Sequence, residues 1–472
     1  MVNAGAGRDF PRGVALLVAA ALFMEILDGT IIVTALPAIA ADLSVDPLDA
    51  NLAVAAYLIT VAVVIPVSGW LAERFTVRRV FLVAITVFLV ASALCALSTS
   101  LPMLVAARVL QGLGGALMVP VGRLAVLRAV DRNQLVAAIA WLTWPALVAP
   151  VLAPLLGGLI ATYLTWQWIF LINVPLALIG LAVAWRMMPG EDAPAEHRPI
   201  DGWGIVTVVL AVAAGMVGLD AIRVGSVHWP VLLPAAAVCV IVTAIAARHL
   251  RSTAHPLVNT NVLRIATFRS VTVYGSCYRA VITAVPFLLP LMFQLRFDWS
   301  AVKAGALVSA LFLGNVIVKP TTTALMRVVG IKRLLVVTLL ASIVVTGALS
   351  LISPGTPLWV IAALLCVSGA LRSIGFTAYN TLAFADVDAA QLTDANTIHA
   401  CAQELFAGIG VACAVVATAA GAALLDHGWI PFAASDFGGA FVLLTLLMAA
   451  TLYGALRLPP SAGAYVTGTA RA

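Results

Sequence analysis

The sequence predicts an all-α membrane protein. Of its 472 residues, 63% are hydrophobic and only 10% are charged, and the mean hydropathy is +1.11. A helix that crosses a bilayer needs about 20 apolar residues, and the chain divides into fourteen such segments separated by short polar stretches. The segments are too long and continuous for barrel strands, which alternate polar and apolar residues over about 10 positions. This composition excludes a secreted or cytosolic enzyme.

The predicted helices form three groups along the chain. Six precede a polar segment at 189–202, six follow another polar segment at 249–265, and a pair with few charges lies between these segments. In order, we expect helices at 12–36, 50–72, 79–97, 101–126, 134–161, 167–188, 203–221, 228–248, 266–292, 300–326, 333–352, 356–382, 395–424 and 436–458. This pattern predicts an N-terminal six-helix bundle (1–188), cytoplasmic linkers with inserted helices 7 and 8 (189–265), and a C-terminal six-helix bundle with a short cytoplasmic tail (266–472).

Positive charge predicts the orientation of these helices. Loops on the cytoplasmic side of a membrane carry an excess of Lys and Arg. With the N-terminus in the cytoplasm, most of the 26 basic residues are cytoplasmic; the exceptions are three outside (Arg223, Arg296, Lys303) and five within helices (Arg108, Arg123, Arg279, Lys319, Arg372). We therefore expect a multi-pass protein of the plasma (inner) membrane with both termini in the cytoplasm. Nucleic acid is not an expected partner, because no basic face is clustered with exposed aromatic residues.

Neither metals nor organic cofactors are expected. The six cysteines all lie within predicted helices and form no C-x-x-C pair, and the histidines are scattered. The chain also has no phosphate-binding G-x-x-x-x-G-K-[ST] loop, so ATP is not expected to be its direct energy source.

Two acidic residues in the first helix are candidates for proton binding. Ionisable side chains in hydrocarbon are costly and usually face a cavity or a partner. Glu25 and Asp28 are three residues apart, and therefore about 60° apart around the helix. Two neighbouring buried carboxyl groups titrate as a coupled pair, so this pair is a candidate site for loading and unloading a proton.

Depth in the membrane predicts a partner for Asp28. Asp28 and Arg108 each lie roughly 11 Å from the outer ends of their helices, at 1.5 Å per residue, so they can pair if the helices are neighbours. Protonation of Asp28 would then release Arg108, which makes the pair a charge switch. The alternative is a static structural salt bridge.

The second bundle holds the remaining intramembrane charges. Arg372 and Glu404 lie about 15 and 14 Å from their cytoplasmic ends and form a second candidate pair, whereas Arg279 and Lys319 have no obvious acid. This positive surplus favours anionic, zwitterionic or neutral ligands, although Lys319 could extend toward the cytoplasm.

Two tryptophans lie deep inside the fifth helix, away from the interfacial positions that tryptophan prefers. Trp141 and Trp144 could line a ligand cavity or form packed aromatic core.

The loop between the second and third helices carries a recognisable motif. Residues 69–79 read GWLAERFTVRR and resemble the signature loop of the major facilitator superfamily, G-x-L-a-D-r-x-G-r-r-r. The resemblance implies a gating role for Gly69, Glu73, Arg74 and Arg78. Here Glu73 replaces the usual aspartate and Thr76 replaces a glycine, so we expect the turn at Thr76 to be built differently.

Further motifs extend the resemblance over nearly the whole chain. Residues 27–37 and 108–116 are similar to the helix 1 and helix 4 motifs of the fourteen-helix drug:proton antiporters of the EmrB/QacA type, in which the helix 4 arginine is implicated in proton transfer. Residues 166–175 resemble that family's helix 6 start. The segments 119–123 and 379–382 look closest to the MdtD-like branch.

The antiporter motif of the fifth helix is altered. It is a run of G-P and G-G pairs that lets helices pack closely and bend, and here it reads APVLAPLLGG at 149–158. Pro150, Pro154, Gly157 and Gly158 are present, and we assign them a conformational role; helix packing alone is the alternative for the glycines. Alanines occupy the two other glycine positions, and alanine is still small enough for close contact.

The resemblance implies the major facilitator fold, with two six-helix bundles and an inserted two-helix hairpin, working by alternating access around a midplane cavity. The expected function is proton-coupled, multidrug efflux of lipophilic small molecules by a monomer in the lipid bilayer, with the proton gradient as energy source. We assign proton coupling to Asp28, Glu25 and Arg108, and the substrate cavity to Arg279, Arg372, Glu404, Trp144, Trp141 and Gln111.

Two alternatives to this function remain. One is a dedicated exporter or lipid translocator for an anionic or zwitterionic substrate. The other is a membrane sensor or an enzyme, which is poorly supported because no nucleophile–base arrangement can be read from the sequence.

Overall fold

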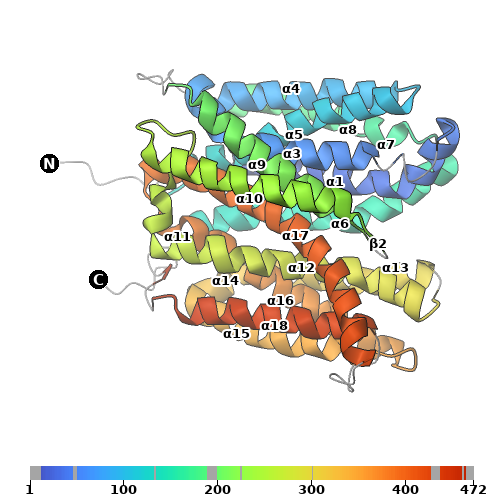
Figure 1. The fold of residues 1–472 in the computed structure, drawn as a ribbon. Helices are drawn as coiled ribbons and strands as arrows, with labels where there is room; N and C mark the ends of the chain where they lie inside the picture. Colours follow the sequence, from blue (N-terminus) through green and yellow to red (C-terminus); the bar gives the residue numbers. More distant parts are fainter. Residues whose placement is uncertain are drawn as a thin grey trace.

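The computed structural model describes residues 12–45, 50, 52–131, 134–188, 199–223, 226–299, 301–426, 436–459 and 462–463. Within these ranges the chain is almost entirely helical (Figure 1). The exception is a pair of two-residue strands, β1 (Ile222–Arg223) and β2 (Ser226–Val227), which pair antiparallel between two helices. The predicted all-α class is confirmed, and the small β-ribbon was not predicted.

The first group of helices lies in the upper half of Figure 1. It consists of α1 (Arg12–Asp42), α3 (Leu52–Phe75), α4 (Val77–Ala96), α5 (Leu101–Ala129), α6 (Leu135–Tyr163), α7 (Trp168–Leu171) and α8 (Asn173–Met187). The pairs α4–α5, α1–α6 and α3–α5 pack most extensively, and their apolar faces form two buried clusters. Burial of these faces in a shared core fixes the neighbours of the charged side chains on α1 and α5.

A hairpin of α9 (Gly202–Asp220) and α10 (Trp229–Ser252) follows. α9 packs against α3 and α17, whereas α10 packs mainly on α9 and leaves most of its apolar side chains exposed. Asp201 caps α9, because its carboxylate accepts a hydrogen bond from the Gly204 amide at 2.8 Å. The same carboxylate lies 2.7 Å from His249 Nε2 near the end of α10 and accepts from the Leu257 amide, so it fastens the hairpin to the next linker.

The last group of helices lies in the lower half of Figure 1 and shares one large apolar core. It consists of the 3₁₀ turn η2 (Thr260–Arg264), α11 (Ala266–Ser270), the π-turn η3 (Val271–Gly275), α12 (Ser276–Leu291), the π-turn η4 (Met292–Arg296), α13 (Ala301–Ile317), α14 (Lys319–Val329), α15 (Ile331–Leu349), α16 (Leu358–Ala385), the 3₁₀ turn η5 (Ala389–Gln391), α17 (Leu392–Asp426) and α18 (Asp436–Leu456).

Three of the predicted helices are interrupted. The segment predicted at 167–188 is divided at Ile172 into α7 and α8. The segment predicted as one helix at 300–326 is divided at Val318 into α13 and α14, because Pro320 has no amide hydrogen and fits best in the first turn of a new helix. The segment at 266–292 contains the π-turn η3 directly after α11, and a second π-turn, η4, extends it from Met292 to Arg296.

Thirteen helical segments of the described chain are long and apolar enough to cross a membrane. α6 has 29 residues, and at 1.5 Å per residue it is about 43 Å long, so it supplies the fourteenth predicted span. The predicted helix positions therefore agree with the observed helices to within a few residues.

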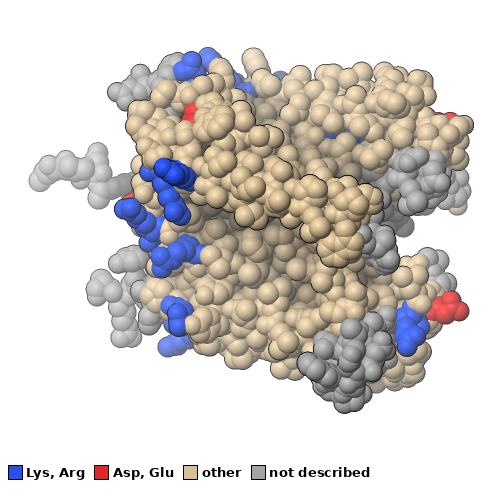
Figure 2. Space-filling model, viewed as in Figure 1, with Lys and Arg blue, Asp and Glu red and all other residues tan. Residues whose placement is uncertain are grey.

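Basic side chains are unevenly distributed over the face in Figure 2. Most Lys and Arg side chains gather at the end of the molecule where α11 lies in Figure 1. We call this the basic end. The sides between the two ends are almost free of charge, as expected for a surface in contact with lipid.

Candidate functional site

The two acidic residues of α1 have different surroundings. Asp28 is buried, and its two carboxylate oxygens accept three hydrogen bonds: from Arg108 Nη1 at 2.5 Å, Gln111 Nε2 at 2.8 Å and Asn173 Nδ2 at 2.7 Å. Among the described residues, each of these three partners donates a hydrogen bond, which is the role that complements a carboxylate oxygen. The predicted contact between Asp28 and Arg108 is therefore present, while its role in proton coupling remains a prediction.

Arg108 keeps neutral partners besides Asp28. Its Nε donates to the Ala53 carbonyl at 3.2 Å, its Nη1 donates to Gln111 Oε1 at 2.6 Å, and its guanidinium carbon lies 4.2 Å from the centre of the Tyr57 ring. These contacts help to position the guanidinium beside Asp28. The side chains that surround the pair come from α1, α3, α5, α7 and α8.

Gln111 belongs to this buried cluster and not to the substrate cavity predicted for it. It lies one helical turn after Arg108, so it shares the face of α5 that is turned toward α1 and α4. Its amide donates to Asp28 and to Ser92 Oγ at 2.9 Å, and its oxygen accepts from Arg108. We call Asp28, Arg108, Gln111 and Asn173 the Asp28 cluster.

Glu25 faces a different space, a cavity of about 240 Å³ between the two groups of helices. The cavity brings together Glu25 of α1 with three residues assigned to the substrate site, which are Arg279 of α12, Arg372 of α16 and Glu404 of α17. Arg123 of α5 also lines it, although it was only noted as an intramembrane charge. Its remaining walls are mixed apolar and amide side chains, including Ile65, Phe312, Asn315, Phe376 and Gln403. We call this space the central cavity.

The predicted pair of Arg372 with Glu404 is wrong. Glu404 interacts electrostatically with Arg279 and Arg123. Within the described residues no carboxylate lies within 4.0 Å of the Arg372 guanidinium. Equal depth in the membrane made the pair possible, but depth does not fix the direction of a side chain around its helix. The sequence analysis found no acidic partner for Arg279, and the structure places Glu404 in that role.

Several polar atoms at the central cavity are buried without a hydrogen-bond partner. They are Arg123 Nη1, Arg279 Nε, Asn315 Oδ1, Arg372 Nη1 and Gln403 Oε1. Buried polar groups nearly always find a partner in protein, water or ligand. A cavity with aromatic walls and a few converging unpaired donors and acceptors is typical of a small-molecule site.

Tyr57 contacts the Asp28 cluster and lies near Glu25, and the sequence analysis did not identify it. Its ring stacks on Arg108, and its hydroxyl is buried without a partner. A Cβ atom built on Gly115 would lie 3.1 Å from the Tyr57 hydroxyl and 3.6 Å from Glu25 Oε1, so Gly115 leaves a space that both groups face. The available signal was a tyrosine inside an otherwise apolar helix, which is weak because packed tyrosines are common.

Contacts across the two groups of helices close the molecule at the basic end. Gly69 of α3 packs on Thr397 of α17, where a Cβ atom would lie only 2.3 Å from the Thr397 hydroxyl. Arg128 Nη2 donates to Thr393 Oγ1 at 2.9 Å, and Asn396 Nδ2 donates to the Pro120 carbonyl at 2.9 Å. We call these contacts the inner gate. Gly69, predicted to be a gating residue, is thus placed at a contact between the groups.

The rest of the signature loop connects α3, α4 and α8. Arg78 donates to the Trp185 carbonyl at 2.6 Å and lies over its ring, while Glu73 and Arg74 are half-buried. The expectation of a differently built turn is wrong, since Thr76 adopts a φ of +71°, in the range that favours glycine. Its hydroxyl accepts from the Arg79 amide at 3.5 Å and so caps α4.

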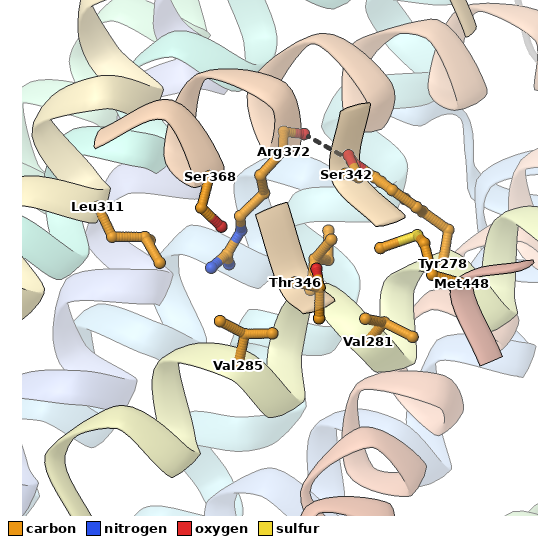
Figure 3. Close-up of a pocket in the computed structure, with 10 residues that line it drawn as sticks. Tyr278, Val281, Val285, Leu311, Ser342, Thr346, Ser368, Arg372 and Met448 are labelled. Carbon is orange, nitrogen blue, oxygen red and sulfur yellow. Dashed lines mark hydrogen bonds between the residues drawn. The ribbon is translucent and has the colours of Figure 1, made fainter. Parts of the chain in front are cut away.

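The remaining predicted residues lie on α6. Trp141 is 41% exposed and lines neither the central cavity nor the cavity shown in Figure 3. Gly157 is buried in the helix. The side-chain environments of Trp144, Pro150, Pro154 and Gly158 lie outside the described residues.

Comparison with known proteins gives a consistent family. The family model described as Major Facilitator Superfamily matches residues 18–411. A relative from Cronobacter sakazakii, which bears the name multidrug resistance protein MdtD, is 34% identical over 434 residues that cover 92% of this chain and 91% of the relative. Another protein of that name, from Pectobacterium carotovorum, is 34% identical over 84% of this chain and 85% of the relative. A Haemophilus influenzae transport protein named HsrA is 34% identical over 85% and 86%.

Solved structures show the same fold at low sequence identity. The human organic anion transporter MFSD10 aligns with a TM-score of 0.63 and 13% identity, covering 94% of this chain and 99% of that protein. The proton:xylose symporter XylE aligns with a TM-score of 0.63 and 11% identity, covering 98% of both chains. Both are transporters of the superfamily whose family model matches this chain, so the predicted fold is confirmed.

Proposed function

The chain belongs to the major facilitator superfamily, in its MdtD-like branch, and from this premise we propose that it exports lipophilic small molecules in exchange for protons. The observation that carries the proposal is the Asp28 cluster, in which a fully buried carboxylate is held by a fully buried arginine at 2.5 Å. Breaking such a pair by removing one charge is costly. Binding of one proton to Asp28 therefore has a large effect on the contacts that join α1 to α5 and α8.

The two carboxyl groups of α1 differ in their access to the central cavity, and together they form a route for the proton. Glu25 lines the central cavity, whereas Asp28 is only 1% exposed. The Tyr57 hydroxyl, which both donates and accepts, lies next to the Gly115 space that Glu25 also faces. We assign Glu25 the entry of the proton from the cavity, Asp28 its storage, and Tyr57 the connection between them.

The transport cycle then couples proton and substrate through the same cavity. The inner gate closes the basic end, so we assign this conformation to the outward-facing half of the cycle. A proton taken up at Glu25 and passed to Asp28 removes the charge that holds Arg108. The helices reorient, the proton leaves to the cytoplasm, and substrate binds between Glu25, Glu404 and the cavity arginines before export.

The basic end is assigned to the cytoplasm. Cytoplasmic loops carry an excess of Lys and Arg, and these side chains gather at the end where α11 lies (Figure 2). The proposal places a monomer in the plasma (inner) membrane with both termini in the cytoplasm. Its energy source is the proton gradient, with no bound cofactor.

A second candidate function follows from the charge of the central cavity. Arg123, Arg279 and Arg372 face only Glu25 and Glu404 there, so the cavity carries one positive charge more than negative when all five are ionised. This surplus favours a dedicated exporter or lipid translocator whose substrate has an anionic or zwitterionic group.

Proton flux in liposomes distinguishes the two candidates. Purified protein would be reconstituted with a pH-sensitive dye inside the vesicles and an imposed pH gradient, and then exposed to cationic, neutral and anionic lipophilic compounds. Proton flux evoked by cationic or neutral compounds supports the multidrug antiporter. Flux evoked by anionic compounds alone supports the dedicated exporter, and saturable binding without proton flux from any class contradicts antiport.

A further inference from the structure

Arg372 also lines a second, smaller cavity inside the C-terminal group of helices. This cavity of about 20 Å³ lies between α12, α13, α15, α16 and α18 (Figure 3). Its polar wall consists of Arg372 and the side chains of Ser342, Thr346, Ser368 and Tyr278. No carboxylate lines it. Because Arg372 borders both cavities, it forms part of the boundary between them.

The guanidinium of Arg372 has no partner for its charge. Its Nη1 atom is buried without a hydrogen bond, and no carboxylate of the described chain lies within 4.0 Å. The charged neighbour with which it interacts is Arg279, which repels it. Arg372 is half-buried, and its Nη1 atom is shielded from water. A charge without a partner in such surroundings is unfavourable, so a ligand of opposite charge is favoured at this position.

Of the four hydroxyl groups that line the cavity, two already donate hydrogen bonds within the protein. Tyr278 donates to main-chain carbonyls of α16, and Ser342 donates to the Thr338 carbonyl. By contrast, no hydrogen bond is formed by the Thr346 or Ser368 hydroxyl among the described residues. Figure 3 shows the Arg372 side chain extending toward Ser368, with Thr346 on the neighbouring helix. Positive charge and free donors on one wall, without an acid, are a site for an anion.

Size and charge restrict the identity of the anion. A space of this volume holds about one water-sized species, which excludes phosphate, sulfate and organic anions. The central cavity has three arginines and two glutamates, and the arginine left without an acid is Arg372, so one negative charge gives neutrality. We propose that this second cavity binds a single halide ion, chloride under cellular conditions, between Arg372, Ser368 and Thr346.

The halide site is separate from the proton-coupled export proposed above. Chloride bound in the second cavity would neutralise Arg372 from the side opposite the central cavity. The charged groups of the central cavity would then have no net charge. An anionic group of a substrate could also reach Arg372, but only from the central cavity. The experiment therefore uses inorganic halide without any substrate.

The test measures thermal unfolding of the purified full-length protein at constant ionic strength. Sodium gluconate is replaced stepwise by sodium chloride or bromide. The wild type is expected to show a saturable rise in Tm with halide, and Arg372→Gln is expected to lose it. Arg279→Gln is the matched control: it also removes a cavity arginine, but one that faces Glu404, and it should keep the halide response. The absence of a halide response, or an equal response in Arg372→Gln, would overturn the proposal.

Milder variants cover the case that Arg372→Gln does not fold. Thr346→Val and Ser368→Ala leave the arginine in place and remove one donor each. Since a hydrogen bond to a charged group contributes about 1.5–3 kcal/mol, each should weaken the apparent halide affinity at least about tenfold. Crystals grown in bromide would locate the bound ion by its anomalous scattering. A peak beside Arg372 and Ser368 is expected, whereas a peak only beside Arg123 or Arg279 would contradict the site.

Discussion

Two intramembrane arginines, one from each group of helices, differ in the partner of their charge. In the N-terminal group, Arg108 has a carboxylate at 2.5 Å, a main-chain carbonyl, an amide oxygen and an aromatic face. In the C-terminal group, Arg372 has no carboxylate of the described residues within 4.0 Å. Protonation of the partner carboxylate changes the surroundings of a paired arginine. An arginine without such a partner is instead available to a ligand of opposite charge. Under the proposed function, this difference assigns energy coupling to Arg108 and ligand binding to Arg372.

The strongest contrast concerns stability. Arg108→Ala would leave the Asp28 carboxylate buried without a cation and should lower the free energy of unfolding by about 3–5 kcal/mol. Arg372→Ala removes a charge that has no partner, so in halide-free buffer it should cost far less or stabilise the protein. Thermal unfolding of both variants checks the contrast, with Arg108→Lys keeping the charge as a control. Equal decreases in Tm for the two alanine variants would contradict the difference between Arg108 and Arg372.

A smaller effect is expected at the connection between Glu25 and Asp28. Tyr57→Phe removes the hydroxyl but keeps the ring over Arg108, and Gly115→Ala places a methyl group in the space shared by Tyr57 and Glu25. Both should slow substrate-evoked proton flux by about a hundredfold, the lower end of the range for a lost proton-transfer group. Substrate binding should change little. Binding can be followed by tryptophan fluorescence, and unchanged proton flux in both variants would remove Tyr57 from the route.

The charge of the central cavity predicts a shift in selectivity. Glu404 interacts with Arg279 and Arg123, so Glu404→Gln leaves a more positive cavity. Competition assays should show weaker binding of cationic compounds and stronger binding of anionic ones, by several-fold in each direction. Arg372→Gln should shift preference the opposite way. If neither variant changes the ranking of cationic and anionic ligands, these residues do not contact the substrate.

Sequence was sufficient for the order and approximate limits of the helices, because long apolar runs between polar loops have few alternative structures in a membrane. It was also sufficient for the contact of Asp28 with Arg108, since both depth and side-chain chemistry agreed. It failed for Arg372 and Glu404, whose depths also agreed. Depth fixes one coordinate of a side chain, but its direction around the helix depends on how the helices pack.

The same limit applies to Gln111, which was predicted in the cavity but points into the Asp28 cluster. Tyr57 and Asn173 were not identified as site residues because neither carries a charge, and uncharged polar residues in helices are usually packing residues. The division of the 300–326 segment was foreseeable from Pro320. The left-handed backbone of Thr76 was not, because threonine rarely adopts it.

The α9–α10 hairpin provides a reference outside both groups, and the smallest effect is expected there. Burial alone would raise the pKa of Asp201, but hydrogen bonds from His249 and from the amides of Gly204 and Leu257 hold this pKa below its usual value. A carboxyl group with a lowered folded pKa stabilises the protein above its ordinary pKa, and this contribution is lost as the pH falls through the folded value. The Tm of wild type should therefore fall more steeply than that of Asp201→Asn below about pH 4. Parallel plots of Tm against pH for the two proteins would show that the Asp201–His249 contact does not stabilise the hairpin.

The central claim is that Asp28 couples proton movement to export, and Asp28→Asn tests it most directly. This variant keeps the size of the side chain and removes its charge. Wild type and variant would be compared in liposomes for substrate-evoked proton flux and for substrate exchange in the absence of a pH gradient. The account predicts that the variant loses proton flux while it still binds substrate. Full substrate-evoked proton flux in Asp28→Asn would contradict it and leave the Asp28–Arg108 contact as a static structural salt bridge.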